Sequence, residues 1–428
     1  MRRLLLVGIV VVLAGCAAPG VGGNSIDGTV GEVDGVTHNK SLAITPEDGF
    51  NETERDRLVR RSMARIEVVR GLEFKRMVEL EVIARQTYRE QRANRSRGEE
   101  QRQWDNQIWE GLFIVGEDRD VNSAIDQTFG ESVQGYYLPG RDRIVIVSDS
   151  ETPTISKRTL VHELVHALQD QQFGLNNRPE TEDGKMARNS VVEGEASLLP
   201  RLYFDRCDGE WSCIRPDTSG DSSDREIDQG IFQMVIYPYS RGPNFVDQFR
   251  QEGGWTAVDT LHDRLPETTE QVLHPDSYPD EEPLEVTVSD QSTDEWSRLD
   301  FDPPGERLGE AAIFSMFATN DVVATDPRSY RDPVSAGWGG DKLVPYRSDD
   351  GEFGYVWELA WDSETDAQEF HEAYLALLED HGAVEERQGV YVVPDGPFED
   401  AFRVTLDGQR VRIVNAPAVE KLSAIHGS

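Results

Sequence analysis

Two histidines one helical turn apart carry the strongest chemical signal in the chain. Residues Thr159 to Leu168 contain a His-Glu-x-x-His pattern, His162, Glu163 and His166, inside an apolar stretch. On a helix, residues i and i+4 share a face, so both ring nitrogens can converge on one metal ion. Glu163 stands beside them, where a carboxylate can take a proton from metal-bound water. The spacing therefore predicts a hydrolytic zinc site.

A catalytic zinc ion takes three protein ligands and keeps a fourth position open, so a third ligand is needed. Glu193 lies on the next helical stretch, with 26 residues between it and His166. Its one-turn neighbours are all small and would let a second helix approach closely: Asn189, Ser190, Ala196 and Ser197. Glu195 is the rival ligand, but two residues away it projects in another direction. We therefore expect His162, His166 and Glu193 to bind Zn²⁺ and Glu163 to act as the catalytic base.

This arrangement resembles the gluzincin metallopeptidases, in which a glutamate on a following helix completes a zinc-binding His-Glu-x-x-His helix. The segment Glu193 to Ala196 resembles the one whose first glutamate binds zinc in that clan. With Thr269 to Pro275, the wider pattern resembles uncharacterised prokaryotic metallopeptidases, and the whole chain is similar to a haloarchaeal lipid-anchored surface-protein family of unassigned activity. The resemblance implies Zn²⁺ as cofactor and a peptide or protein as substrate. Two features depart from it: a long gap before Glu193, and the absence of an aspartate four residues after it.

Two further features could serve catalysis. Tyr239 and His274 are candidates for stabilising an oxyanion, although each is also explained as an ordinary packed or surface residue. Residues 135–147 form a predicted hairpin around a Pro-Gly turn, immediately before the motif helix. The edge of this hairpin could bind an extended peptide by strand addition. Strand pairing within the fold would explain the hairpin equally well.

The N-terminus has the form of an export signal. Two arginines precede an apolar run from Leu4 to Leu13, which is too short to span a membrane stably. The run ends in Leu13-Ala14-Gly15-Cys16, which resembles a lipobox with Cys16 as the acylated first residue of the mature chain. We expect a signal peptide over residues 1–15 and a lipid anchor on the outer face of the cytoplasmic membrane. A plain secretory signal with an incidental cysteine is the alternative.

The other two cysteines, Cys207 and Cys213, are close in sequence. In an exported protein this pair could form a disulfide. A zinc site is the weaker alternative, because no second Cys or His cluster lies nearby and the spacing exceeds that of a usual zinc knuckle.

The charge indicates habitat rather than chemistry. With 80 Asp and Glu against 43 Lys and Arg, the formal net charge is −37, which argues against nucleic-acid binding. The chain has only six lysines, and an acidic, lysine-poor surface is typical of proteins from extreme halophiles. An ordinary acidic secreted protein is the alternative.

The predicted fold class is α+β, and four parts follow each other along the chain. The signal peptide over 1–15 precedes a flexible tether over 16–50, a zincin-like metallopeptidase domain over 51–283 and a C-terminal α+β domain over 284–428. We expect helices over 51–71, 85–97, 156–172, 185–206, 242–251 and 364–381, and strands over 77–83, 355–361, 390–393, 402–406 and 411–414. We assign no functional role to two predicted loops. One is a tight turn at Trp338 to Asp341, and the other is the acidic loop Asp217 to Asp228, which lacks EF-hand spacing for Ca²⁺.

These signals predict a cell-surface zinc metallopeptidase. One rival is a surface binding or assembly protein with a structural or vestigial zinc site, and another is a zinc hydrolase with a non-peptide substrate. A fourth protein ligand such as His274 would favour the structural role, and an open fourth position would favour catalysis.

Overall fold

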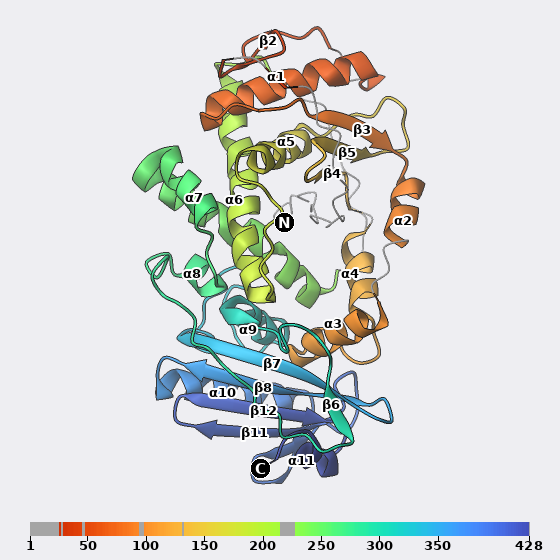
Figure 1. Cartoon of the computed structure of the whole chain (residues 1–428), viewed down its shortest axis with the longest axis vertical. Coiled ribbons are helices and arrows are strands. Elements are labelled where there is room, and N and C mark those ends of the chain that lie inside the picture. Colours follow the sequence, from red (N-terminus) through yellow and green to blue (C-terminus); the bar gives the residue numbers. More distant parts are fainter. Residues whose placement is uncertain are drawn as a thin grey trace.

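The computed structural model describes residues 25–26, 29–44, 48–93, 98–130, 132–214 and 227–427. The predicted signal peptide and Cys16 lie outside these residues. The molecule is α+β: helices and a three-stranded sheet form one end, and a seven-stranded sheet with the C-terminus forms the other (Figure 1). Among the described residues, no helix is long and apolar enough to cross a membrane.

The helices are α1 (Glu52–Arg70), α2 (Arg85–Ala93), α3 (Glu99–Gly111), α4 (Val121–Phe129), α5 (Lys157–Gln172), α6 (Glu182–Asp205), α7 (Gln229–Asp263), α8 (Thr269–Leu273), α9 (Gly309–Thr319), α10 (Glu364–Asp380) and α11 (Leu422–Ile425). The strands are β1 (Glu32–Val33), β2 (Val36–Thr37), β3 (Glu79–Ile83), β4 (Gly135–Leu138), β5 (Arg143–Val147), β6 (Trp296–Arg298), β7 (Trp338–Ser348), β8 (Phe353–Trp361), β9 (Val384–Arg387), β10 (Val390–Val392), β11 (Ala401–Asp407) and β12 (Arg410–Ala416).

Helix α1 begins and ends where the sequence predicts. The Asn51 side chain accepts a hydrogen bond from the Glu54 N–H (3.1 Å), and the Glu54 carboxylate accepts one from the Asn51 N–H (3.0 Å). This reciprocal pair satisfies two donors that open the helix. Gly71 ends the helix in the left-handed conformation (φ 77°), which glycine adopts without steric cost.

Residues 29–44, which fall within the predicted tether over 16–50, pack against α1. Strands β1 and β2 pair as a small hairpin, and Val33 is fully buried. The Glu67 carboxylate of α1 accepts a hydrogen bond from the Gly31 N–H (2.9 Å). The tether prediction is therefore wrong for this stretch, because two-residue strands carry no sequence periodicity.

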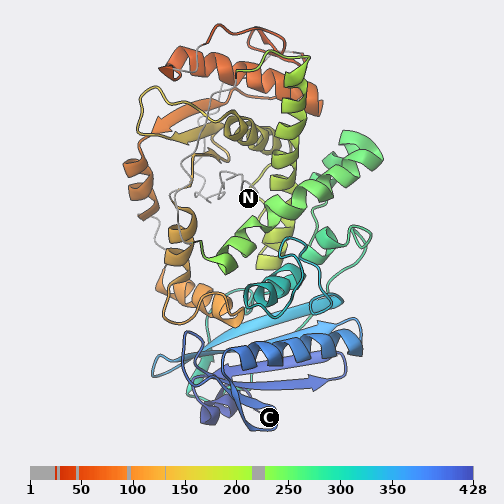
Figure 2. The ribbon, with the colours of Figure 1, turned by 180° about the vertical axis from the view of Figure 1, so that it is seen from behind.

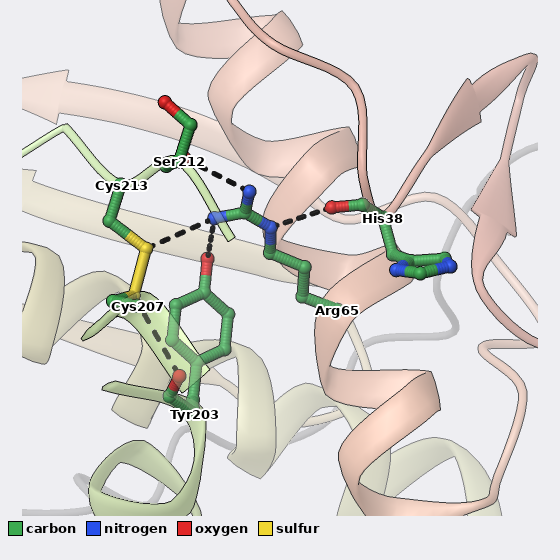
Figure 3. Close-up of a disulfide and its surroundings, with 6 residues drawn as sticks. All are labelled: His38, Arg65, Tyr203, Cys207, Ser212 and Cys213. Atoms are coloured by element: carbon green, nitrogen blue, oxygen red, sulfur yellow. Dashed lines mark hydrogen bonds between the residues drawn. A yellow bond between two sulfur atoms is a disulfide. The ribbon is translucent and has the colours of Figure 1, made fainter. Parts of the chain in front are cut away.

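Figure 3 shows Arg65 of α1 between this hairpin and the disulfide that joins Cys207 to Cys213. The guanidinium donates hydrogen bonds to the carbonyl oxygens of His38 (2.7 Å) and Ser212 (3.0 Å). The disulfide loop is thus fastened to α1, and these two cysteines are not available to bind a metal.

The three-stranded sheet has the order β3-β5-β4, with β3 parallel and β4 antiparallel to β5. The hairpin predicted over 135–147 is confirmed. Asp170 at the end of α5 accepts hydrogen bonds from the Tyr137 hydroxyl (2.8 Å) and the Gly140 N–H (2.7 Å), which ties the hairpin to α5. Strand β4 is an edge, and no other described strand pairs with its outer side.

Helices α6 and α7 pack backbone to backbone. A side chain at Gly194 would lie 2.5 Å from the Gly242 backbone, and one at Gly242 would lie 2.2 Å from the Ser190 carbonyl oxygen. The small face of α6 therefore admits α7. Helix α7 is longer than the predicted 242–251. It runs through Pro238 and Pro243, residues that normally end a helix, and a kink at Gly254 (φ 67°, ψ −163°) divides it into two helical segments.

The seven-stranded sheet has the order β6-β7-β8-β12-β11-β10-β9, and each pair of neighbours is antiparallel. Helix α10 lies across one face of this sheet, and Figure 2, the view from the side opposite to Figure 1, shows the helix in front of the strands. The predicted C-terminal strands and helix are confirmed, but the predicted turn at Trp338 to Asp341 is wrong. These residues open β7, the longest strand, with an irregular register between Trp338 and Gly340.

One hydrophobic core runs from the helices into this sheet. Trp104 and Ile108 of α3 belong to the same buried cluster as Trp357 and Phe370, and residues of α6, α7 and α9 connect them. A separate core lies between α1, α5, α6 and the small sheet. Buried residues from both sides of residue 283 share this larger core, so the predicted boundary there does not separate two independent cores.

Asp341, 3 % exposed, organises the junction of α9 with this sheet. Its carboxylate accepts hydrogen bonds from the indole N–H groups of Trp338 and Trp357 (both 3.0 Å) and from the backbone N–H groups of Leu308 (3.1 Å) and Gly309 (3.0 Å). Four donors thus depend on one buried carboxylate.

Asp341→Ala should lower the free energy of unfolding by about 3–4 kcal/mol, because it leaves these four donors buried without an acceptor. Urea unfolding in molar salt, followed by tryptophan emission, measures the loss. Asp350→Ala, at an exposed turn between β7 and β8, is the matched control and should change stability by no more than about 0.5 kcal/mol. Equal stability of the two variants would contradict this role of Asp341.

Candidate metal centre

Two neighbouring helices bring the three predicted ligands together. His162 and His166 project from α5 and Glu193 from α6, and all three side chains are buried, with exposed fractions of 7, 1 and 3 %. Helix α5 begins at the N-cap Ser156, whose side chain accepts a hydrogen bond from the Thr159 N–H. These three residues form one of the three groups of potential metal ligands among the described residues.

The ligand atoms form a nearly equilateral triangle. The Nε2 atoms of His162 and His166 are 3.2 Å apart, and Oε2 of Glu193 lies 3.2 Å from the first and 3.3 Å from the second. In a tetrahedral zinc site with bonds of about 2.0–2.1 Å, neighbouring ligand atoms are about 3.3–3.4 Å apart. The triangle therefore has the dimensions of one face of a zinc tetrahedron.

The tautomer of His166 follows from its neighbour Gln169. The Gln169 Nε2 group donates to the Val192 carbonyl oxygen (3.0 Å) and to the Glu195 carboxylate (2.8 Å), so its Oε1 atom is the one that faces His166 Nδ1 (3.0 Å). Oε1 can only accept, so Nδ1 must carry a proton. The other nitrogen, Nε2, is left to bind a metal ion.

Glu195 holds Gln169 in place and does not join the metal ligands. Its carboxylate, 1 % exposed, pairs with the Arg70 guanidinium of α1 and with Nε2 of His262 on α7 (2.6 Å). His262 stacks on Phe173, with ring centroids 4.4 Å apart. The rival ligand of the sequence analysis is thus committed to a different network, and Glu193 alone of the two faces the histidines.

The site concentrates charge that a metal ion would balance. Burial lowers the pKa of His166, but the nearby Glu193 carboxylate outweighs this effect and raises the pKa to about 9. Burial raises the pKa of Glu193, but the two histidines outweigh it and lower the pKa to about 2. Without a metal ion, a proton on His166 thus balances the negative charge of Glu193. A bound cation would take over this role and displace the proton.

Glu163 lies fully buried beside the ligands, and neither carboxylate oxygen has a hydrogen-bond partner. Burial is the largest effect on the pKa of Glu163 and raises it to about 8, although His166 and the Tyr137 backbone act in the opposite direction. A buried carboxylate without hydrogen-bond partners is stable only with a proton, a water molecule or a cation beside it. Catalytic bases often have raised pKa values of this kind.

The two oxyanion candidates occupy different places. The Tyr239 ring of α7 lies against His162, with centroids 6.3 Å apart and planes at 21°. His274 instead pairs through Nε2 with Glu310 of α9 (3.1 Å). His274 does not join the metal-ligand group, and no fourth His, Cys, Asp or Glu among the described residues does so.

The residues that orient this site were not predicted from the sequence: Arg70, Gln169, Glu195 in its actual role, and His262. Gln169 could have been found, because a polar residue three positions after a helical histidine shares its face. Arg70 and His262 could not, since they come from helices far away in the sequence.

Residues 297–426 match the model of a domain family described only as a domain of unknown function, DUF8575. No curated protein and no solved structure matches the chain. The match covers the seven-stranded sheet with α9, α10 and α11, whereas all four residues of the candidate site precede it. The site is therefore interpreted from its own geometry.

Gln169→Leu should weaken zinc binding about 10- to 100-fold, because it removes the acceptor that orients His166 while the three ligands stay in place. Competition with a chromophoric chelator measures the affinity. Gln172→Leu is the matched control on the same helix, since its amide bonds only the Glu73 carbonyl oxygen near the surface. Unchanged affinity in Gln169→Leu would show that this amide does not orient the ligand.

Proposed function

We propose that this protein is a cell-surface zinc metallopeptidase that hydrolyses peptide bonds with a metal-activated water. One observation carries the proposal: a triangle of ligand atoms of zinc dimensions, His162, His166 and Glu193, with the unpartnered Glu163 on the same helix. A structural zinc site has no use for such a carboxylate, whereas a hydrolytic site requires one.

Each residue then has a distinct role. Zinc held by His162, His166 and Glu193 would supply a Lewis acid that brings the pKa of a bound water towards neutrality. Glu163 takes the proton of the attacking water and passes it to the leaving amine. The positive charge of a bound ion would lower the pKa of Glu163 from about 8 and so favour its basic form. Tyr239, whose ring lies against His162, is our candidate donor to the oxyanion.

The open ligand position supports catalysis over a structural role. Among the described residues, the ligand group has three members, and His274 is engaged with Glu310. Tetrahedral zinc would keep its fourth position for water or substrate.

Strand β4 is the proposed substrate platform. It lies at the edge of the small sheet and is tied to the ligand helix α5 through Asp170. An extended peptide could pair with its outer side, which would hold the scissile bond near α5 without demanding a particular side chain.

Glu163→Gln should reduce cleavage of an unstructured protein such as casein by about 10²–10⁴-fold in molar salt, because glutamine cannot accept the water proton. Zinc content should stay near that of the wild type, since the three ligands are untouched. Glu180→Gln, an exposed glutamate near the start of α6, is the matched control and should cleave normally. Wild-type and Glu163→Gln proteins that cleave equally fast would exclude this helix as the active site.

A wild-type protein that holds zinc tightly and cleaves no peptide would instead favour the rival roles, a structural site in a surface binding protein or a hydrolase with a non-peptide substrate. A screen of ester and amide substrates separates these two.

We further propose that Cys16 is acylated and anchors the protein at the outer face of the cytoplasmic membrane. Cys16→Ser should leave the protein unprocessed or released from membranes, because it removes the proposed lipid attachment point. Fractionation and mass spectrometry of the mature N-terminus test this. An unmodified Cys16 in mature, membrane-associated protein would contradict it.

A further inference from the structure

A second group of oxygen ligands lies far from the zinc ligands in the sequence, where α3 meets the large sheet. Glu110 at the end of α3, Glu117 in the following loop and Asp400 before β11 offer ligand atoms within 4.8 Å of one another. Glu110 and Asp400 are 5 and 4 % exposed, and Glu117 is exposed. Three carboxylates thus meet at a site that opens to solvent on one side.

The carboxylates have no positive partner. None of the three makes an ion pair with a described residue, and each raises the pKa of a neighbour. Burial and then Asp400 raise the pKa of Glu110, and burial and then Glu117 raise that of Asp400 to about 8. Charged groups buried this way are otherwise paired or bound to a cation.

Buried oxygen atoms without partners surround the same carboxylates. Oδ1 of Asp400 has no hydrogen-bond partner, while its Oδ2 accepts from the Asn415 amide (2.7 Å). Asn415, 1 % exposed, leaves its own Oδ1 unpartnered, and Gln107, 5 % exposed, donates to Glu110 (2.6 Å) and leaves Oε1 unpartnered. Native proteins rarely bury acceptors in this state.

We propose that these residues form a calcium site that fastens the helical part of the chain to the large sheet. The ligand atoms are carboxylate oxygens, among them the unpartnered Oδ1 of Asp400, without nitrogen or sulfur, and hard cations prefer such a set. Calcium accepts six to eight oxygens at about 2.3–2.6 Å in irregular geometry, whereas magnesium demands a near-ideal octahedron. Water at the Glu117 side completes the shell and gives the ion an entry path.

An ion at this position would connect two parts of the fold. Glu110, Gln107 and Glu117 come from α3 and the loop after it, whereas Asp400 directly precedes β11 and Asn415 lies on β12. The same junction is apolar next to the site, where Phe113 packs on Phe398 with centroids 4.9 Å apart, and the Glu117 N–H donates to the Pro397 carbonyl oxygen (3.0 Å). A bound ion converts the repulsion of the three carboxylates into attraction across this junction.

A second acidic group lacks the buried, unpartnered oxygen atoms of the proposed calcium site. Glu270, Glu281 and Asp362 also lie within reach of one ion, but none of their oxygens is buried without a partner. That group therefore serves as the control.

The test uses the detergent-solubilised full chain, depleted of calcium by a chelating resin and kept in molar NaCl to screen the acidic surface. Millimolar CaCl₂ should raise Tm by at least about 3 °C, and MgCl₂ should raise it less. Equilibrium dialysis should find about one more calcium per chain in the wild type than in Asp400→Asn.

Asp400→Asn and Glu117→Gln should both lose the calcium-dependent rise in Tm, and Asp362→Asn should keep it. Glu117 is exposed, so its variant tests the site without disturbing the core. His166→Ala should also keep the response, which separates this site from the zinc centre. No rise in the wild type, an equal rise in Asp400→Asn, or an equal rise with magnesium would overturn the proposal.

Discussion

The arrangement of the candidate metal centre depends on one buried carboxylate, Glu195, which lies outside the ligand triangle. Glu195 pairs with Arg70 and His262 and accepts a hydrogen bond from Gln169, whose remaining oxygen fixes the proton of His166 on Nδ1. Removing a partner from such a network leaves a buried charge unpaired, which is costly in a site that excludes water. The tautomer of the ligand is therefore set by residues from four helices, and the rest of the fold has to deliver them.

This requirement explains features that otherwise look incidental. Helix α1 must end close to α6, because its last residue, Arg70, supplies the guanidinium; Arg70 also bonds Asp259 (2.6 Å) and lies over Trp255 (4.7 Å), both on α7. The chain of α7 must continue past its prolines and past the kink at Gly254 to place His262, while Gly194 and Gly242 let the segment before the kink contact α6 at backbone distance. The long helix and the glycine pair are thus consequences of holding Glu195.

The sequence predicts the local parts of this design and misses the distant ones. The capped α1, the β4–β5 hairpin and the ligand helix α5 follow from patterns within some twenty residues, where spacing and cap chemistry decide. The grouping of His162, His166 and Glu193 was also predictable, because helical periodicity separates Glu193 from Glu195. The partners Arg70 and His262 were not, since nothing in the sequence states which helices meet. Strand β7 was missed because its Trp-Gly-Gly-Asp start has the residues of a turn, and the burial of Asp341 by two indoles overrides that local preference.

The acidic composition likewise does not show which carboxylates are buried or which groups lie opposite them. A net charge of −37 reads as a solvated surface, and most carboxylates fit this description. Several are buried, and for three of these the groups opposite explain the burial: Arg70 and His262 for Glu195, two histidines for Glu193, four N–H donors for Asp341. Glu110 and Asp400 each face a single amide N–H, from Gln107 and Asn415, and no cationic side chain among the described residues; amide oxygens without partners lie beside them. Composition cannot distinguish these two from the other acids. Their burial can, because a low-dielectric site that gathers negative charge and free acceptors is stable only when a cation or protons fill it.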